Sequence, residues 1–123
     1  MSPTALTQAL RRSFAGSMFD ARSGHLEIVL LHGESVRVTT TLEIGGDVVR
    51  IFVGRIVHAA SFEDAADIDH IVAIVQAIQR GGASECFHVT PSGIAYAGHT
   101  IRGDDFEYNT ADLDARDLLS FPV

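Results

Sequence analysis

Residues 41–60 read TLEIGGDVVRIFVGRIVHAA, and this stretch decides the fold. Apolar and polar residues alternate along much of it, and glycine interrupts the pattern at Gly45-Gly46 and at Gly54. Alternation with a period of two is typical of strands, and glycine readily adopts the positive φ that tight hairpin turns need. The stretch therefore predicts consecutive antiparallel strands. Residues 56–60 either form a separate strand or continue the preceding one past a bulge.

Two segments before this stretch extend the predicted sheet. Residues 36–44 alternate most regularly, which indicates a strand with one buried and one solvated face. Residues 25–31 predict another strand, and we expect its buried face to carry Leu26, Ile28 and Leu30. A turn over residues 32–35 joins the two strands.

Two long segments have the periodicity of helices. Residues 3–18 carry an apolar residue at every fourth position, which predicts one apolar stripe on a helix. Residues 61–80 carry a broader stripe of isoleucine and valine, and Gly81-Gly82 provides a stop. We expect Ser61 to cap the start of this second helix.

The last third of the chain predicts more strands and a final helix. Residues 85–90 and 94–101 form a hairpin pattern around Pro91-Ser92-Gly93, and residues 106–108 predict a short strand. A helix is expected over residues 111–119. The whole pattern predicts an α+β fold, an antiparallel meander sheet packed with helices in the order α-β-β-β(β)-α-β-β-α.

Length and composition favour one globular domain over residues 1–123. No apolar run approaches the length of about 18 residues that spans a bilayer. The first residues lack the pattern of a signal peptide, so we expect a cytoplasmic location. The net charge of −7 opposes attraction to phosphate backbones and anionic lipids. We therefore expect neither nucleic acid nor a membrane as a partner.

Histidine and cysteine are the residues that metal or nucleophilic chemistry would use. Cys86 and His88 are expected on one side of a strand with His99 on the strand opposite, so one hypothesis is a metal-dependent or small-molecule enzyme that uses these three residues. However, residues two apart on a strand lie about 7 Å apart, too far for a direct hydrogen bond. We assign no catalytic residue, metal or cofactor, and we interpret His58 as a core or sheet-edge histidine.

The central stretch and the segments after it resemble the PatA N-terminal (PATAN) domain of bacterial signalling proteins. The similarity rests on residues 51–59 (IFVGRIVHA), on the helix end 75–82 (VQAIQRGG) and on the strand 86–89 (CFHV), and it covers residues 42–90. The chain departs from that family by having one residue fewer between Phe52 and Gly54 and an extra hairpin's worth of residues after Leu26. The resemblance implies a non-catalytic regulatory or protein-interaction module.

The predicted order of elements is also similar to that of class I type III secretion chaperones and of YbjN-like proteins. Both are dimeric folds that bind protein partners. This similarity lies in the architecture and has no sequence motif behind it. It implies a homodimer that holds a client protein.

Apolar residues on both faces of the predicted strands indicate self-association. One face of residues 48–53 should pack against the helix over residues 61–80, and the other should meet a second chain or an added layer. We expect an interaction surface made of Val48, Arg50, Phe52, Val29 and Leu31.

Overall fold

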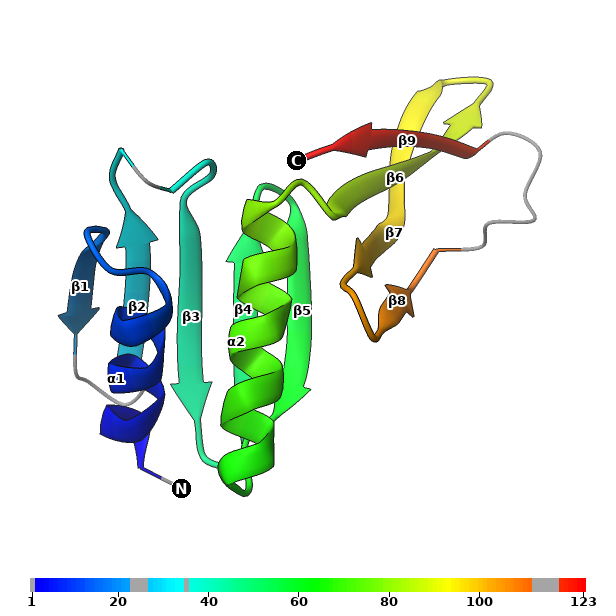
Figure 1. Cartoon of the computed structure of the whole chain (residues 1–123). Helices are drawn as coiled ribbons and strands as arrows, with labels where there is room; N and C mark the ends of the chain where they lie inside the picture. Colours follow the sequence, from blue (N-terminus) through cyan, green and yellow to red (C-terminus); the bar gives the residue numbers. More distant parts are fainter. Residues whose placement is uncertain (1, 23–26, 35, 112–117) are drawn as a thin grey trace.

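The computed structural model describes residues 2–22, 27–34, 36–111 and 118–123 (Figure 1). Within these ranges it has an α+β fold of two helices and nine strands, arranged in two antiparallel sheets. The α+β class predicted from the sequence is confirmed. The elements in chain order are α1 (Pro3–Ser13), β1 (Met18–Arg22), β2 (Glu27–His32), β3 (Thr40–Gly45), β4 (Val48–Val53), β5 (Ile56–Ser61), α2 (Ala65–Gln79), β6 (Ala83–Thr90), β7 (Gly93–Arg102), β8 (Glu107–Asn109) and β9 (Leu118–Pro122).

The first sheet contains five strands in the order β1-β2-β3-β4-β5, each antiparallel to its neighbours. Gly46 and Gly54 adopt positive φ values of 62° and 54° in the hairpin turns that flank β4. β5 pairs with β4 from Val48↔Ser61 to Val53↔Ile56 without a register shift. Residues 56–61 are therefore a separate strand, which settles the alternative left open by the sequence.

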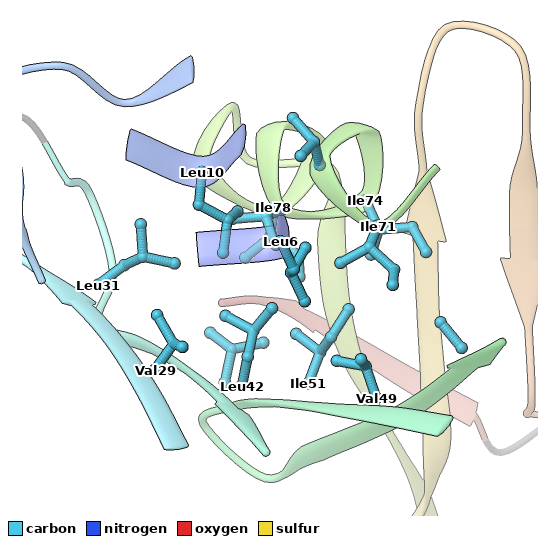
Figure 2. Packing of buried hydrophobic residues seen from close by; sticks show 14 of the residues in the cluster. Leu6, Leu10, Val29, Leu31, Leu42, Val49, Ile51, Ile71, Ile74 and Ile78 are labelled. Atoms are coloured by element: carbon cyan, nitrogen blue, oxygen red, sulfur yellow. The ribbon is translucent and has the colours of Figure 1, made fainter. Parts of the chain in front are cut away.

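Both helices lie on the same face of the five-stranded sheet (Figure 1). The main core lies between the helices and this face, and Figure 2 shows ten of its side chains by name. All ten are completely buried: Leu6, Leu10, Val29, Leu31, Leu42, Val49, Ile51, Ile71, Ile74 and Ile78. Alternate residues of β3 and β4 contribute to this core, as their sequence pattern predicts.

The N-cap of the long helix α2 is Asp64 rather than the predicted cap, Ser61. Asp64 accepts a hydrogen bond from the Asp67 backbone at 3.1 Å, and the Asp67 carboxylate accepts one from the Asp64 backbone at 3.3 Å. This reciprocal pair is a capping box, which satisfies two backbone N–H groups at once. Gly81, with φ of 87°, follows the end of the helix.

The prediction for β2 was wrong about which face is buried. Val29 and Leu31 are completely buried beneath the helices, whereas Ile28 and Leu30 lie on the opposite face. The four residues 28–31 are all apolar, so alternation alone cannot choose between the two faces. The pairing of β2 with β3 decides which face is buried, because Val29 lies opposite the core residue Leu42. Val29 and Leu31 therefore cannot belong to an exposed interaction surface.

Three predicted boundaries also differ. The first helix ends at Ser13 because Gly16 turns the chain with φ of 87°, and β1 follows. Residues 36–39 do not pair with a neighbouring strand, because the Gln79 side chain takes up the backbone of Val38. Gln79 Oε1 accepts from the Val38 N–H at 3.1 Å, and Gln79 Nε2 donates to the Val38 carbonyl at 2.7 Å. Residues 118 and 119 begin a strand instead of ending a helix, and residues 112–117 lie outside the described residues.

The second sheet contains four strands in the order β8-β7-β6-β9, all antiparallel to their neighbours. The predicted hairpin of β6 and β7 is confirmed, with a register shift between Cys86 and Phe87. In Figure 1 this sheet extends away from the body formed by the first sheet and the helices. No helix in the described part of the chain is long and apolar enough to cross a membrane.

Candidate interaction surfaces and a buried histidine junction

The five-stranded sheet has one face that neither helix covers, here called the outer face. Val48, Arg50 and Phe52 lie on it, in agreement with the sequence prediction for these three residues. Near the middle of the outer face, Arg50 on β4 forms an ion pair with Glu43 on β3, with 3.6 Å between Nη1 and Oε1. Its other large apolar side chains are Met18, Ile28, Leu30 and Val57, of which Met18 is 61% and Val57 52% exposed. The outer face is therefore mixed, with apolar side chains around an ion pair.

The four-stranded sheet displays a more strongly apolar surface. Strand pairing places six side chains on one face, and we call this set the apolar patch: Phe87, Val89, Ile94, Tyr96, Leu119 and Phe121. Five of the seven large hydrophobic residues exposed in the described ranges belong to it. The sequence contains a signal for the patch. Phe87 and Val89 are two residues apart on one strand, as are Ile94 and Tyr96 on the next, and residues with this spacing lie on the same face of a strand.

Phe87 is the centre of the apolar patch. Its ring meets the rings of Tyr96 and Phe121 edge to face, each at 5.7 Å between centroids. At the border with the body, the Arg55 guanidinium lies 5.9 Å from the centroid of Phe87. The backbone N–H of Arg55 donates to the Glu85 carboxylate at 2.8 Å. The rings thus hold one another in place in a row across three strands.

Charge is absent from the side chains of the apolar patch. Partial burial, with Glu85 and Cys86 nearby, raises the pKa of the Tyr96 phenol, so this group stays neutral at physiological pH. The five exposed members have exposed fractions between 39% and 59%. With about 150–250 Å² per large side chain, they present on the order of 400 Å² of accessible surface. Patches of roughly 300–600 Å² are the largest on typical monomers and are often functional.

The same face of the four-stranded sheet is covered at its other end. Ala83 and Ile101, a directly paired couple, are completely buried in the main core. His99 and Tyr108 also lie on this face and contact the body. This face therefore continues from the core into solvent, with Glu85 between the covered end and the apolar patch, and the described chain covers only its first half.

A histidine junction joins this covered end to the body. His58 on β5 and His99 on β7 are 6% and 5% exposed, and His58 Nδ1 lies 3.0 Å from His99 Nε2. His99 Nδ1 lies 3.2 Å from the Thr110 hydroxyl oxygen, and His70 on α2 bonds the Tyr108 hydroxyl. The Tyr108 ring lies 4.5 Å from the His58 ring between centroids. His58 is therefore a buried histidine on an edge strand, as expected for a core or sheet-edge histidine, but one of its ring nitrogens is not satisfied within the described residues.

Burial disfavours the charged forms of His58 and His99. Burial, helped by the neighbouring His99 and His70, lowers the pKa of His58 to about 4, and burial also lowers the pKa of His99. Among the described residues, His58 Nε2 has no hydrogen-bond partner. Within the described residues, no group of three or more His, Cys, Asp or Glu side chains is arranged to hold a metal ion.

The predicted trio of Cys86, His88 and His99 is not brought together. Cys86 and His88 point to one face of β6, whereas His99 lies opposite Glu85 and shares the other face. The ring nitrogens of His99 meet His58 and Thr110 instead. Strand alternation separates the thiol from this imidazole, so the cysteine–histidine hypothesis has no geometric basis.

An open groove of about 780 Å³ runs between α2 and the turn that follows β7. Its lining includes His70, Gln76 and Phe106 together with Arg80 and Arg102. Both arginines already have acidic partners, since Arg80 lies 3.6 Å from Asp104 and Arg102 lies 3.3 Å from Glu107. We assign no ligand to the groove.

Comparison of the chain with protein-family models, with curated proteins and with solved structures finds no match. Sequence patterns predicted three residues of the outer face. They did not predict the contact between His58 and His99, because 41 residues and a change of sheet separate the two histidines.

Proposed function

We propose that this chain is a small non-catalytic protein-interaction or regulatory domain that self-associates. The observation that carries the proposal is the apolar patch, a contiguous row of aromatic and aliphatic side chains on an open sheet. Surfaces of this kind occur at protein contacts and are unfavourable when left in water. The PATAN-like resemblance of residues 42–90 points to the same class of function.

The area of the apolar patch, about 800 Å² over two copies, is that of a weak or transient contact. If two copies each remove on the order of 400 Å² of apolar surface from water, the gain is about 20 kcal/mol at 25 cal/mol per Å². Lost translational and rotational freedom opposes this by roughly 4–15 kcal/mol. The difference of roughly 5–16 kcal/mol is an upper bound on the affinity, because area buried between proteins does not convert fully into binding free energy. An interface of this size is typical of a weak or transient dimer, so micromolar concentrations are the range to test.

A second candidate function is that of a dimer that holds a client protein, as secretion chaperones do. The uncovered outer face favours it, since Phe52 and Val57 pair across β4 and β5 beside the Arg50–Glu43 ion pair. Apolar anchors beside a charged pair can bind another chain with defined orientation. In this arrangement self-association and client binding use different sheets.

The test of the proposal is the molar mass of the whole chain in solution. Sedimentation equilibrium across the micromolar range should show a shift from the 13.2 kDa monomer toward twice that mass as concentration rises. A chain that stays at 13.2 kDa throughout this range contradicts self-association.

A further inference from the structure

We propose that the contact between His58 and His99 is an acid-sensitive link between the two sheets. When this pair takes up a proton, the four-stranded sheet separates from β5 and α2, while the five-stranded sheet and the helices stay folded. The separation involves neither the apolar patch nor a second copy of the chain. The position of the two rings, their hydrogen bonds and their neighbours support it.

The two rings lie where the sheets meet. His58 is on β5, an edge strand of the five-stranded sheet, and His99 is on β7 of the other sheet; both side chains are more than nine-tenths buried. The ten core residues labelled in Figure 2 all belong to the five-stranded sheet and the helices. The four-stranded sheet adds Ala83 and Ile101 to this core as completely buried members. The body therefore keeps most of its core if the four-stranded sheet separates.

The hydrogen-bond pattern places the protons on the two rings. The Thr110 hydroxyl oxygen lies 3.2 Å from both the carbonyl oxygen and the Nδ1 of His99. A hydroxyl that donates to the carbonyl accepts from Nδ1–H, so His99 Nε2 accepts from His58 Nδ1–H at 3.0 Å. His58 Nε2 is then a nitrogen without hydrogen. The opposite tautomers would leave a buried N–H without an acceptor at this atom, which is the rarer arrangement in proteins.

A further proton has no favourable position in the closed junction. It must go to His58 Nε2, for which the described residues offer no acceptor, or add a second hydrogen between two nitrogens 3.0 Å apart. Either position buries a charge without a partner. Burial and the neighbouring His99 and His70 accordingly lower the pKa of His58 to about 4, from 6.5 in water. Separation exposes both rings to water, where they bind protons more readily.

The titratable groups on α2 and β8 do not stabilise the added charge. Tyr108 on β8 bonds His70 on α2, and a charged His70 can still donate to the Tyr108 oxygen. The charge on His70 would itself repel a charged His58. Asp67, near His70, accepts hydrogen bonds from the Ser61 hydroxyl and the Glu63 N–H.

The neighbours on β6 and β4 do not stabilise it either. Glu85 pairs with His99 across β6 and β7, and its negative charge favours a charged His99. However, the Glu85 carboxylate accepts from the Arg55 N–H at 2.8 Å, and both ring nitrogens of His99 have other partners. Burial outweighs Glu85 and lowers the pKa of His99. On β4, His58 lies opposite Ile51, which carries no charge.

The test measures how often each part of the molecule opens. Ile101→Cys reports on the covered end of the four-stranded sheet, and Val49→Cys is the matched control in the body; both positions are completely buried. Each is combined with Cys86→Ser, so that the new thiol is the only one. The rate of reaction with dithiodipyridine, relative to that of the urea-unfolded chain at the same pH, gives the equilibrium constant for opening. Circular dichroism establishes that each variant folds, and Ala83→Cys replaces Ile101→Cys if the latter does not.

Between the two pKa values the separated state binds a proton that the closed state does not, so opening increases as pH falls. From about pH 7.5 to about pH 5 the opening constant at Ile101→Cys should rise about 30-fold through His58 alone. It should exceed the constant at Val49→Cys by more than about tenfold at both pH values. Adding His58→Gln should remove most of the rise.

Equal opening constants at the two positions would overturn the proposal, because the junction would then open only when the whole chain unfolds. An equally large rise with His58→Gln would overturn the assignment to this histidine pair. The measurement needs no second copy of the chain, so its outcome is distinct from that of the self-association test.

Discussion

The His58–His99 junction predicts a specific dependence of stability on pH. His58 has a pKa of about 4 in the folded chain and about 6.5 when unfolded. Between these values the unfolded chain binds a proton that the folded chain does not, so the free energy of unfolding falls as pH falls. The slope approaches about 1.4 kcal/mol per pH unit, and the total loss from His58 is about 3 kcal/mol. The lowered pKa of His99 adds to this loss in the same direction.

The substitution His58→Gln isolates this effect. The glutamine amide can still donate a hydrogen bond to His99 Nε2 but does not titrate, whereas every carboxylate of the chain is unchanged and cancels in the comparison. Urea unfolding at one protein concentration, repeated between about pH 7 and pH 4, should show a shallower loss of stability for the variant. Parallel stability profiles for the wild type and His58→Gln would refute the reasoning.

Three further substitutions test the packing and the cap. Gly82→Ala places a Cβ 2.3 Å from the Arg102 carbonyl oxygen, so thermal denaturation should show a loss of more than about 2 kcal/mol; an unchanged melting temperature contradicts the described join of α2 to β6. Ile51→Ala, at a completely buried position, should cost about 2–5 kcal/mol in urea unfolding, and a loss below about 1 kcal/mol would contradict its place in the core. Asp64→Ala should cost about 1 kcal/mol, with Asp64→Asn close to wild type; equal losses would argue against the cap.

The parts of the fold that the sequence predicted are those with one clear period. β3 and β4 were predicted because Leu42 and Ile51 recur in phase with polar neighbours and glycine marks the turns between strands. The buried face of β2 was not predicted. In an unbroken apolar run either set of alternate residues could face the core, and only the pairing with β3 decides which one does. Leu118 and Leu119 were assigned to a helix because a short apolar pair carries no period of its own.

The candidate surfaces show the same division. Val48, Arg50 and Phe52 were placed on an outward face by alternation within one strand. The apolar patch combines three strands, and β9 joins it only through pairing with β6. Tertiary pairing also separates Cys86 from His99 and joins His99 to His58. Local patterns therefore indicated which side chains were available, and the order of strands decided which of them meet.

The proposed dimer is tested most directly by contacts between copies. In an equal mixture of isotope-labelled and unlabelled chain, an isotope-filtered NOE spectrum detects only protons that are close across the interface. The account predicts intermolecular signals among the Ile94, Tyr96 and Phe121 side chains, together with none from Phe52 or Val57. Intermolecular signals from Phe52 and Val57, with none from the apolar patch, would contradict it.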